Sequence, residues 1–243
     1  MVFSIDKFSI LNRFAFEVPP VGVKYQIDPP KNIKRLKDRM ALCEMLKRAQ
    51  QGEAFFCDSQ NHACEAGAYI LGQQELKKPY YSGEFGAGLK LFDSPRTAAR
   101  LYNYIPARVK GTVRYTTFAP LNRLDFYPDV LLCLCETEQT EILLRAMSYR
   151  NGRMWSSRYS GAIGCAWLFV YPFLSGEINY SITGLGHGMK RRHLFTPGKQ
   201  FVAIPIDRLP EMLDTLKEMP WDLPGYQPDG TEYIKRLSEK LGL

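Results

Sequence analysis

Two cysteines stand at matching positions in the two halves of this sequence. Cys64 lies in SQNHACEAGAY and Cys165 in SGAIGCAWLFV, and each marks the point where a polar, glycine-containing segment becomes apolar. We expect both at helix starts, where free backbone N–H groups and the helix dipole stabilise a thiolate. Thiolates suit iron–sulfur clusters and other soft metals. The alternative is core packing, because free cysteine is often buried.

A glycine motif that occurs twice is the second candidate site. FGAGLK begins at Phe85, and GHGMKRR begins at Gly186. Guanidinium groups and the N–H donors of a glycine turn can hold a carboxylate or phosphate, whereas a solvated basic turn is the equal alternative. A lone glycine pattern is a weak signal. The candidate cofactor-binding residues are Gly86, Gly88, Lys90, Gly186, Gly188, Lys190, Arg191 and Arg192.

These motifs belong to a longer repeat. In each half a strand-like run after proline precedes an amphipathic helix pattern, the cysteine and the glycine motif, in the same order. One insertion, 94–111, accounts for the change in spacing, and Ser94 followed by Pro95 predicts a helix start there. We interpret the series as a tandem duplication. The matching runs are 19–25 and 128–135 for the strands, and 42–52 and 141–152 for the helices.

The predicted fold class is α+β, with two pseudo-symmetric halves packed in one compact domain. Each half should run strand, helix, strand, cysteine-bearing helix, glycine turn, strand. Pockets often form where homologous halves meet, so we expect Cys64 and Cys165 to converge on one. A helix should begin at Pro210, and another should have Thr231 as its N-cap. The predicted boundaries are 1–124 for the first half, 125–209 for the second and 210–243 for a C-terminal helical extension.

The other cysteines fit packing on their spacing alone. Cys43 shares a helix side with Leu46, which favours core packing. Cys133 and Cys135 alternate on a strand and share one face, which also favours packing. Cys57 is expected near the surface. Of the histidines, His62 precedes Cys64 by two residues and His187 lies inside the second glycine motif.

The composition fits a globular protein of 243 residues, with 45% hydrophobic and 23% charged residues. No apolar run reaches the roughly 18 residues of a membrane span, and the N-terminus lacks a signal-peptide pattern, so we expect a cytoplasmic protein with reduced thiols and no membrane partner. The net charge of +7 favours an anionic partner. The basic run 31–39 has helical spacing and reads as a solvated face.

The chain resembles the domain-of-unknown-function 169 family, which comprises archaeal and bacterial proteins that are frequent in anaerobes. The resemblance spans about Val18 to Leu216 and rests on many segments in order. It implies three family cysteines, at Cys43, Cys64 and Cys165, and thereby makes Cys43 a candidate third ligand. It implies no reaction. The matching segments include VPPVGVKY, HACEAGAYILG, KLFDSPRTAARLY and GCAWLFVYPFLSGEINYS, with Glu65 and Ala66 where the family often has proline and glycine.

Three functions compete on this reading. The first is a cofactor protein that holds an iron–sulfur cluster through Cys43, Cys64 and Cys165 in a cleft between the halves, with its reaction and enzymatic status open. The second is a non-catalytic carrier of an anionic organic ligand, such as a tetrapyrrole, clamped by Lys190, Arg191 and Arg192. Nucleic-acid binding ranks last, because the positive charge is diffuse and the aromatics are needed for the core. The sequence leaves room for a homo-oligomer.

Overall fold

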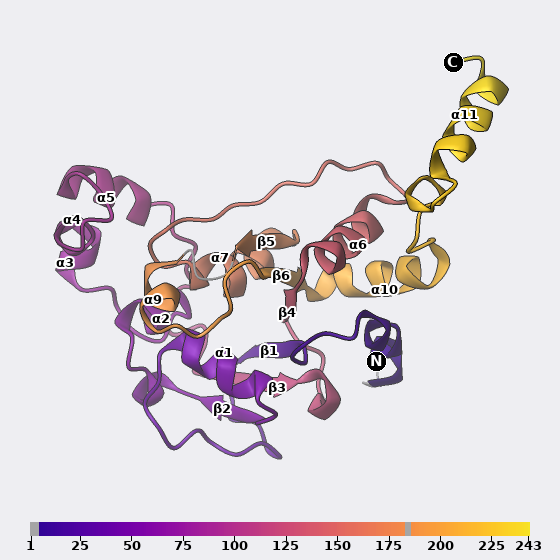
Figure 1. The fold of residues 1–243 in the computed structure, drawn as a ribbon. Helices are drawn as coiled ribbons and strands as arrows, with labels where there is room; N and C mark the ends of the chain where they lie inside the picture. The colour runs from indigo at the N-terminus through magenta and orange to yellow at the C-terminus, as the bar shows by residue number, and fades with distance from the viewer. Residues whose placement is uncertain (1–4, 183–185) are drawn as a thin grey trace.

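The centre of the computed structural model, which describes residues 5–182 and 186–243, is a six-stranded antiparallel sheet (Figure 1). The strand order is β2-β3-β1-β4-β6-β5. Together with the many short helices around it, the sheet confirms the α+β class. The strands are β1 Val21–Gln26, β2 Phe55–Cys57, β3 Tyr115–Pro120, β4 Val130–Cys135, β5 Asn179–Ile182 and β6 Gln200–Pro205.

Helices cover both faces of the sheet, so each face has its own core. The first core is closed by α1 (Leu42–Gln50), α2 (Glu65–Ile70) and α7 (Cys165–Phe169), and the second by α6 (Thr137–Ser148) and α10 (Leu209–Glu218). The remaining helices are α3 Lys78–Tyr81, α4 Glu84–Gly88, α5 Pro95–Tyr102, α8 Tyr171–Ser175, α9 His187–Arg191 and α11 Gly230–Leu241; the 3-10 helices are η1 Ile5–Phe14, η2 Ser59–Asn61, η3 Leu121–Arg123, η4 Ile206–Arg208 and η5 Pro224–Tyr226.

Strand β4 shows how the sequence divides its residues between the two cores. Val130 and Leu132 face the first core, while Leu131, Cys133 and Cys135 face the second, as the two-residue period of a strand requires. Packing is therefore confirmed for both cysteines. Cys57 was predicted near the surface, and this is wrong, because β2 buries its side chain in the first core.

The register of the strand pairings is the same on the two sides of the sheet's centre. In the centre, Val21 pairs with Leu132 and Val23 with Val130. Further out, Val21 pairs with Pro120 just as Val130 pairs with Pro205. A 3-10 helix, η3 or η4, follows each of these prolines. The strands alone would therefore fit two related halves.

The helices do not follow this symmetry. The helix after β1, α1, packs on one face of the sheet, whereas the helix after β4, α6, packs on the other. Strand β2 precedes the helix of Cys64, but β5 follows the helix of Cys165. The strand expected before Cys165 does not form in the described stretch 152–161. The predicted element order is thus wrong in the second half, and the duplication stays a prediction.

The glycine motifs form short helices, not turns. Gly86 and Gly88 lie in α4, and Gly188 lies in α9. A Cβ on Gly86 would be 3.1 Å from the Cβ of Ala98 and 2.8 Å from the hydroxyl of Tyr102. The first glycine therefore serves the close packing of α4 on α5, which with α3 forms a lobe beside the sheet (Figure 1).

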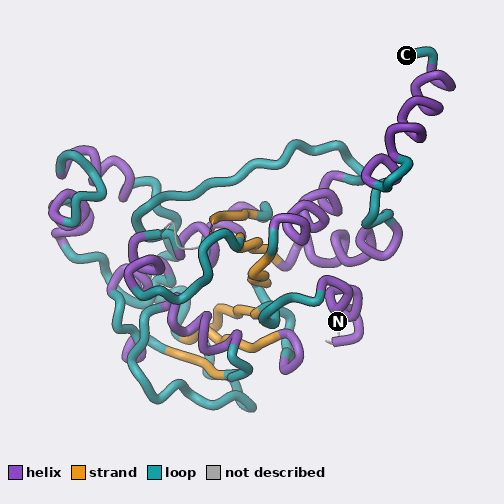
Figure 2. The backbone as a smooth tube through the Cα atoms, viewed as in Figure 1, coloured by secondary structure: helices purple, strands orange, loops and turns teal. Residues whose placement is uncertain are grey.

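Two helix starts were predicted from capping residues, with different outcomes. Ser94 caps α5, since its hydroxyl accepts a hydrogen bond of 3.3 Å from the N–H of Thr97. The N-cap of α11 is Asp229, however, so the assignment of Thr231 was wrong. Helix α11 projects away from the rest of the chain (Figure 2). The basic run 31–39 is not helical: it is an extended loop in which Arg35 bridges Phe56.

The described residues include no helix that is long and apolar enough to cross a bilayer. That finding agrees with the absence of a long apolar run in the sequence.

Candidate functional site

A cavity of about 560 Å³ opens beside the helices that cover the first face of the sheet. Its walls come from α1, α2, α7, α9 and the lobe of α3 to α5. Cys43, Cys64 and Cys165 all line it. Residues more than 120 positions apart in the sequence therefore meet in one pocket, whose volume falls in the usual range for small-molecule sites.

Each cysteine is placed by the start of a helix. Cys43 is the second residue of α1, Cys64 is the N-cap of α2, and Cys165 is the first residue of α7. Helix α2 packs closely on α1, because a Cβ on Gly67 would lie 3.0 Å from the Cβ of Leu42. Cys43 is buried, whereas Cys64 and Cys165 are partly buried.

Burial controls the acidity of two of these thiols. It raises the pKa of Cys43 to about 11, and the charge of Arg192 acts in the opposite direction. It raises the pKa of Cys165 well above the usual value, with further increases from Cys64 and then Cys43. The expected net stabilisation of a thiolate at a helix start is thus wrong for Cys165, where burial outweighs the backbone N–H groups.

The three thiols are not arranged as a metal site. Within residues 5–182 and 186–243, no three histidine, cysteine, aspartate or glutamate side chains are grouped closely enough to hold a metal ion. Cys43, Cys64 and Cys165 share one cavity. For their sulfur atoms to come closer together, the helix starts that carry them would have to move.

Arg192 lines the cavity directly after α9 and pairs with Glu44 of α1. Its Nε lies 3.4 Å from Oε1 of Glu44, and its Nη1 donates to the carbonyl of Gly188 at 3.0 Å. The other carboxylate oxygen of Glu44 accepts a hydrogen bond of 2.6 Å from the N–H of Ala41, at the start of α1. The guanidinium is thus anchored at one edge, and its side chain is only 18% exposed.

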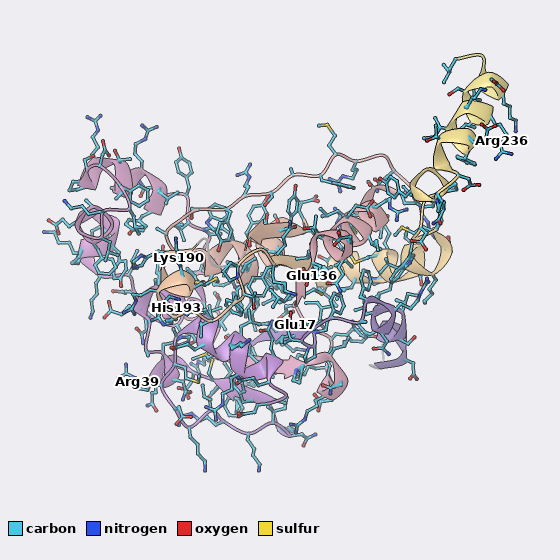
Figure 3. All side chains as sticks on the ribbon, viewed as in Figure 1. Glu17, Arg39, Glu136, Lys190, His193 and Arg236 are labelled. Carbon is cyan, nitrogen blue, oxygen red and sulfur yellow. The ribbon has the colours of Figure 1, made fainter. Side chains whose placement is uncertain are left out.

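Only some of the predicted glycines and basic residues line the cavity. Gly186, Gly188, Arg191 and Arg192 line it. In the first motif the lining residues are instead the neighbours Phe85, Leu89 and Leu91. Lys190 and His193 lie on and just after α9 (Figure 3) and are exposed. Gly86, Gly88, Lys90 and Lys190 are not among the residues that line this cavity.

Tyr159 was missed from the sequence. A Cβ on Gly164 would lie 2.3 Å from its hydroxyl, and a Cβ on Gly186 would lie 3.1 Å from the same atom. The two glycines make room for the phenol ring, whose pKa is raised by burial and then by Cys165. The N–H of His187 donates to the carbonyl of Gly161 at 2.8 Å, so the Cys165 loop and α9 are held together. The signal available was the glycine next to Cys165.

An aromatic wall was also missed. Tyr80, Phe85 and Tyr102 line the cavity from the lobe. The ring centroids of Tyr80 and Phe85 are 4.6 Å apart, and those of Tyr80 and Tyr102 are 6.4 Å apart. Burial raises the pKa of Tyr80 to about 12, and Cys64 is the next cause. Helical spacing in the sequence gave no reason to separate these aromatics from core residues.

His62 is buried beside the cavity walls but does not line it. Its Nε2 lies 2.7 Å from Oε1 of Gln73, and no partner is found for Nδ1 within the described residues. Burial lowers its pKa, against the hydrogen bond to Gln73. A neutral, structural imidazole is the role that this environment favours.

Comparisons with known proteins agree with the resemblance seen in the sequence. The chain is 24% identical over 215 residues to an uncharacterized protein of Methanocaldococcus jannaschii, covering 86% of this chain and 91% of the relative. No solved structure matches significantly. The model of the DUF169 family, described as "Uncharacterised ArCR", matches residues 10–215. With the match extending over most of its length, this chain belongs to the DUF169 family.

Proposed function

We propose that the cavity holds an iron–sulfur cluster through Cys43, Cys64 and Cys165. The observation that carries the proposal is that these three cysteines, from three separate helices, line one cavity. Thiolates are the usual protein ligands of such clusters. Three thiolates would leave one iron open for a substrate or a further ligand.

The donor set fits a cluster chemically, although the thiols must approach one another. The raised pKa values of Cys43 and Cys165 keep both protonated at neutral pH without a metal. A bound cation reverses this, because a coordinating thiol loses its proton outright. Cys64 and Cys165 lie at the starts of helices of six and five residues, so small shifts of short elements would bring them toward Cys43.

We also propose how the site arose and in what cellular environment it works. The symmetric strand pairings support an origin by duplication, with Cys64 and Cys165 as descendants of one position. Six free thiols and an oxygen-sensitive cluster would both suit a reducing cytoplasm, such as that of an anaerobe.

Anaerobic purification followed by iron, sulfide and absorption measurements tests the cluster. We expect iron and sulfide in the purified protein and a broad visible absorption that fades in air. Cys43→Ala, Cys64→Ala and Cys165→Ala should each lower the iron content severalfold. Cys133→Ala is the matched control, since Cys133 is buried in the core on the other face of the sheet. Protein without iron, or iron that survives all three cavity substitutions, would reject the proposal.

The competing function is a carrier of an anionic organic ligand, such as a tetrapyrrole, that needs no cluster. Arg191 and Arg192 in the cavity wall support it. The same preparations separate the two, because a carrier would contain an organic ligand without iron and would retain it in the three cysteine variants.

A further inference from the structure

The cavity has a second chemical surface that the thiols do not use. Tyr80, Phe85 and Tyr102 form an aromatic wall on the lobe, while Arg191 ends α9 and Arg192 follows it directly. We propose that an aromatic or other flat apolar molecule bearing one oxyanion group binds here as the second occupant of the cavity. This inference rests on the proposed cluster only in making the molecule its substrate or ligand; the binding site itself is built from other residues.

The arginines supply the charge recognition. Arg191 lines the cavity and is exposed, and no interaction partner is found for it in the described chain. Arg192 is held at one edge by Gly188 and Glu44, at 3.0 and 3.4 Å. An anchored guanidinium loses less side-chain entropy when it binds, and its fork matches a carboxylate or a phosphate. The pair therefore selects an oxyanion over a neutral molecule.

The aromatic wall supplies the recognition of the apolar body. Phe85 remains 42% exposed although it lines the cavity, so its ring offers unsatisfied apolar surface. Tyr80 packs against Phe85 and Tyr102, which fixes the wall, and Cys64 lines the same cavity. A molecule that covers Phe85 and reaches the arginines would therefore pass the thiols.

A cavity of about 560 Å³ has room for such a molecule. The aromatic wall lies on α3 to α5, whereas Arg191 ends α9 and Arg192 follows it directly. The two surfaces thus come from different segments, which lets charge and shape be changed separately.

Two fluorescent probes of similar shape test the proposal: anilinonaphthalene sulfonate, which is anionic, and N-phenylnaphthylamine, which is neutral. The Arg191→Gln/Arg192→Gln variant should bind the anionic probe about tenfold more weakly or worse, as expected for the loss of charged hydrogen bonds, and the neutral probe within twofold of the parent. Phe85→Ser should weaken both probes. Arg96→Gln/Arg100→Gln, which removes two exposed charges from α5 outside the cavity, is the matched control and should change neither.

Arg191→Gln alone keeps the test valid if the double variant unfolds, because no partner of Arg191 is lost. Displacement of the anionic probe by naphthoate or by naphthyl phosphate identifies the oxyanion that is preferred, and inorganic phosphate should compete at least tenfold less well. Each titration is run on protein with and without iron, so loss of the cluster and loss of the oxyanion site are recorded separately. Unchanged anionic-probe binding in both arginine variants, or equal weakening in the α5 control, would overturn the inference.

Discussion

Arg192, the residue after α9, forms an ion pair with Glu44 of α1, with 3.4 Å between Nε and Oε1, and lines the same cavity as Cys43. The residues are 148 positions apart, and Arg192 lines the cavity. Arg192 lowers the pKa of Cys43 while burial and Glu44 raise it, so the arginine limits how far the thiol is suppressed. One side chain thereby connects the basic helix with the candidate ligand.

Arg192→Gln should therefore make Cys43 less reactive. Its thiol already has a pKa of about 11, and removal of the positive charge raises that pKa further. Thiolate is the reactive form, so alkylation of Cys43 by iodoacetamide near pH 8 should slow by about threefold or more. Mass spectrometry of the Cys43 peptide measures the rate. Arg96→Gln serves as the control, and a faster reaction in Arg192→Gln would show that the arginine shields the thiol sterically.

The contact between Tyr159 and Gly164 predicts a steric effect at the cysteine loop. A Cβ on Gly164 would lie 2.3 Å from the Tyr159 hydroxyl and 2.8 Å from its Cζ. Gly164→Ala should destabilise the protein by about 1–3 kcal/mol, as overpacking does. Tyr159→Phe in the same chain should recover part of this loss, because it removes the nearer atom.

Urea denaturation of the single and double variants measures the coupling between the two positions. Gly161→Ala is the matched control: it lies three residues away, and a Cβ there would meet nothing within 4 Å. Equal stability of Gly161→Ala and Gly164→Ala would contradict the steric account.

How far the sequence predicted the site depends on what each residue does. Cys43, Cys64 and Cys165 were identified because a repeated position and the family resemblance singled them out. Tyr159 and Phe85 were missed, because their roles arise from contacts between segments that the sequence does not align. Burial also reversed an argument: a helix start alone suggested a stabilised thiolate at Cys165, but the surrounding core raises its pKa.

The fold was predictable where periodicity dominates. Strand β4 alternates between two cores as its sequence indicates, and Ser94 caps α5. The sides taken by α1 and α6 were not predictable, since both patterns are amphipathic and either face of the sheet would bury them. The loop 27–41 allows α1 to cross to one face, while α6 begins directly after β4.

Because His62 is buried, the folded protein should lose stability in mild acid. Burial lowers its pKa in the folded protein below the usual 6.5, so the unfolded chain binds the proton more tightly. The contribution of the neutral imidazole is complete above the unfolded pKa and declines as pH falls below it, by at most about 1.4 kcal/mol per pH unit. His62→Gln should therefore flatten the pH dependence of unfolding between pH 7.5 and 5.5. Urea titrations compare it with His193→Gln, an exposed control; equal slopes would contradict burial as the cause.

Removal of the projecting helix α11 should leave the rest of the fold stable. Its apolar side chains remain open, with Tyr233, Leu237 and Leu241 exposed by 39%, 41% and 62%, and its principal contacts are with η5. Ending the chain at Tyr226 should therefore shift the melting temperature by no more than about 2 °C, since little apolar area is lost. Ending it at Arg208 should unfold the protein, because α10 buries Met212 and Leu216 in the second core. Calorimetry measures the melting temperatures of the two truncated proteins. A large drop in melting temperature after the shorter deletion would mean that α11 stabilises the fold by contacts made in solution.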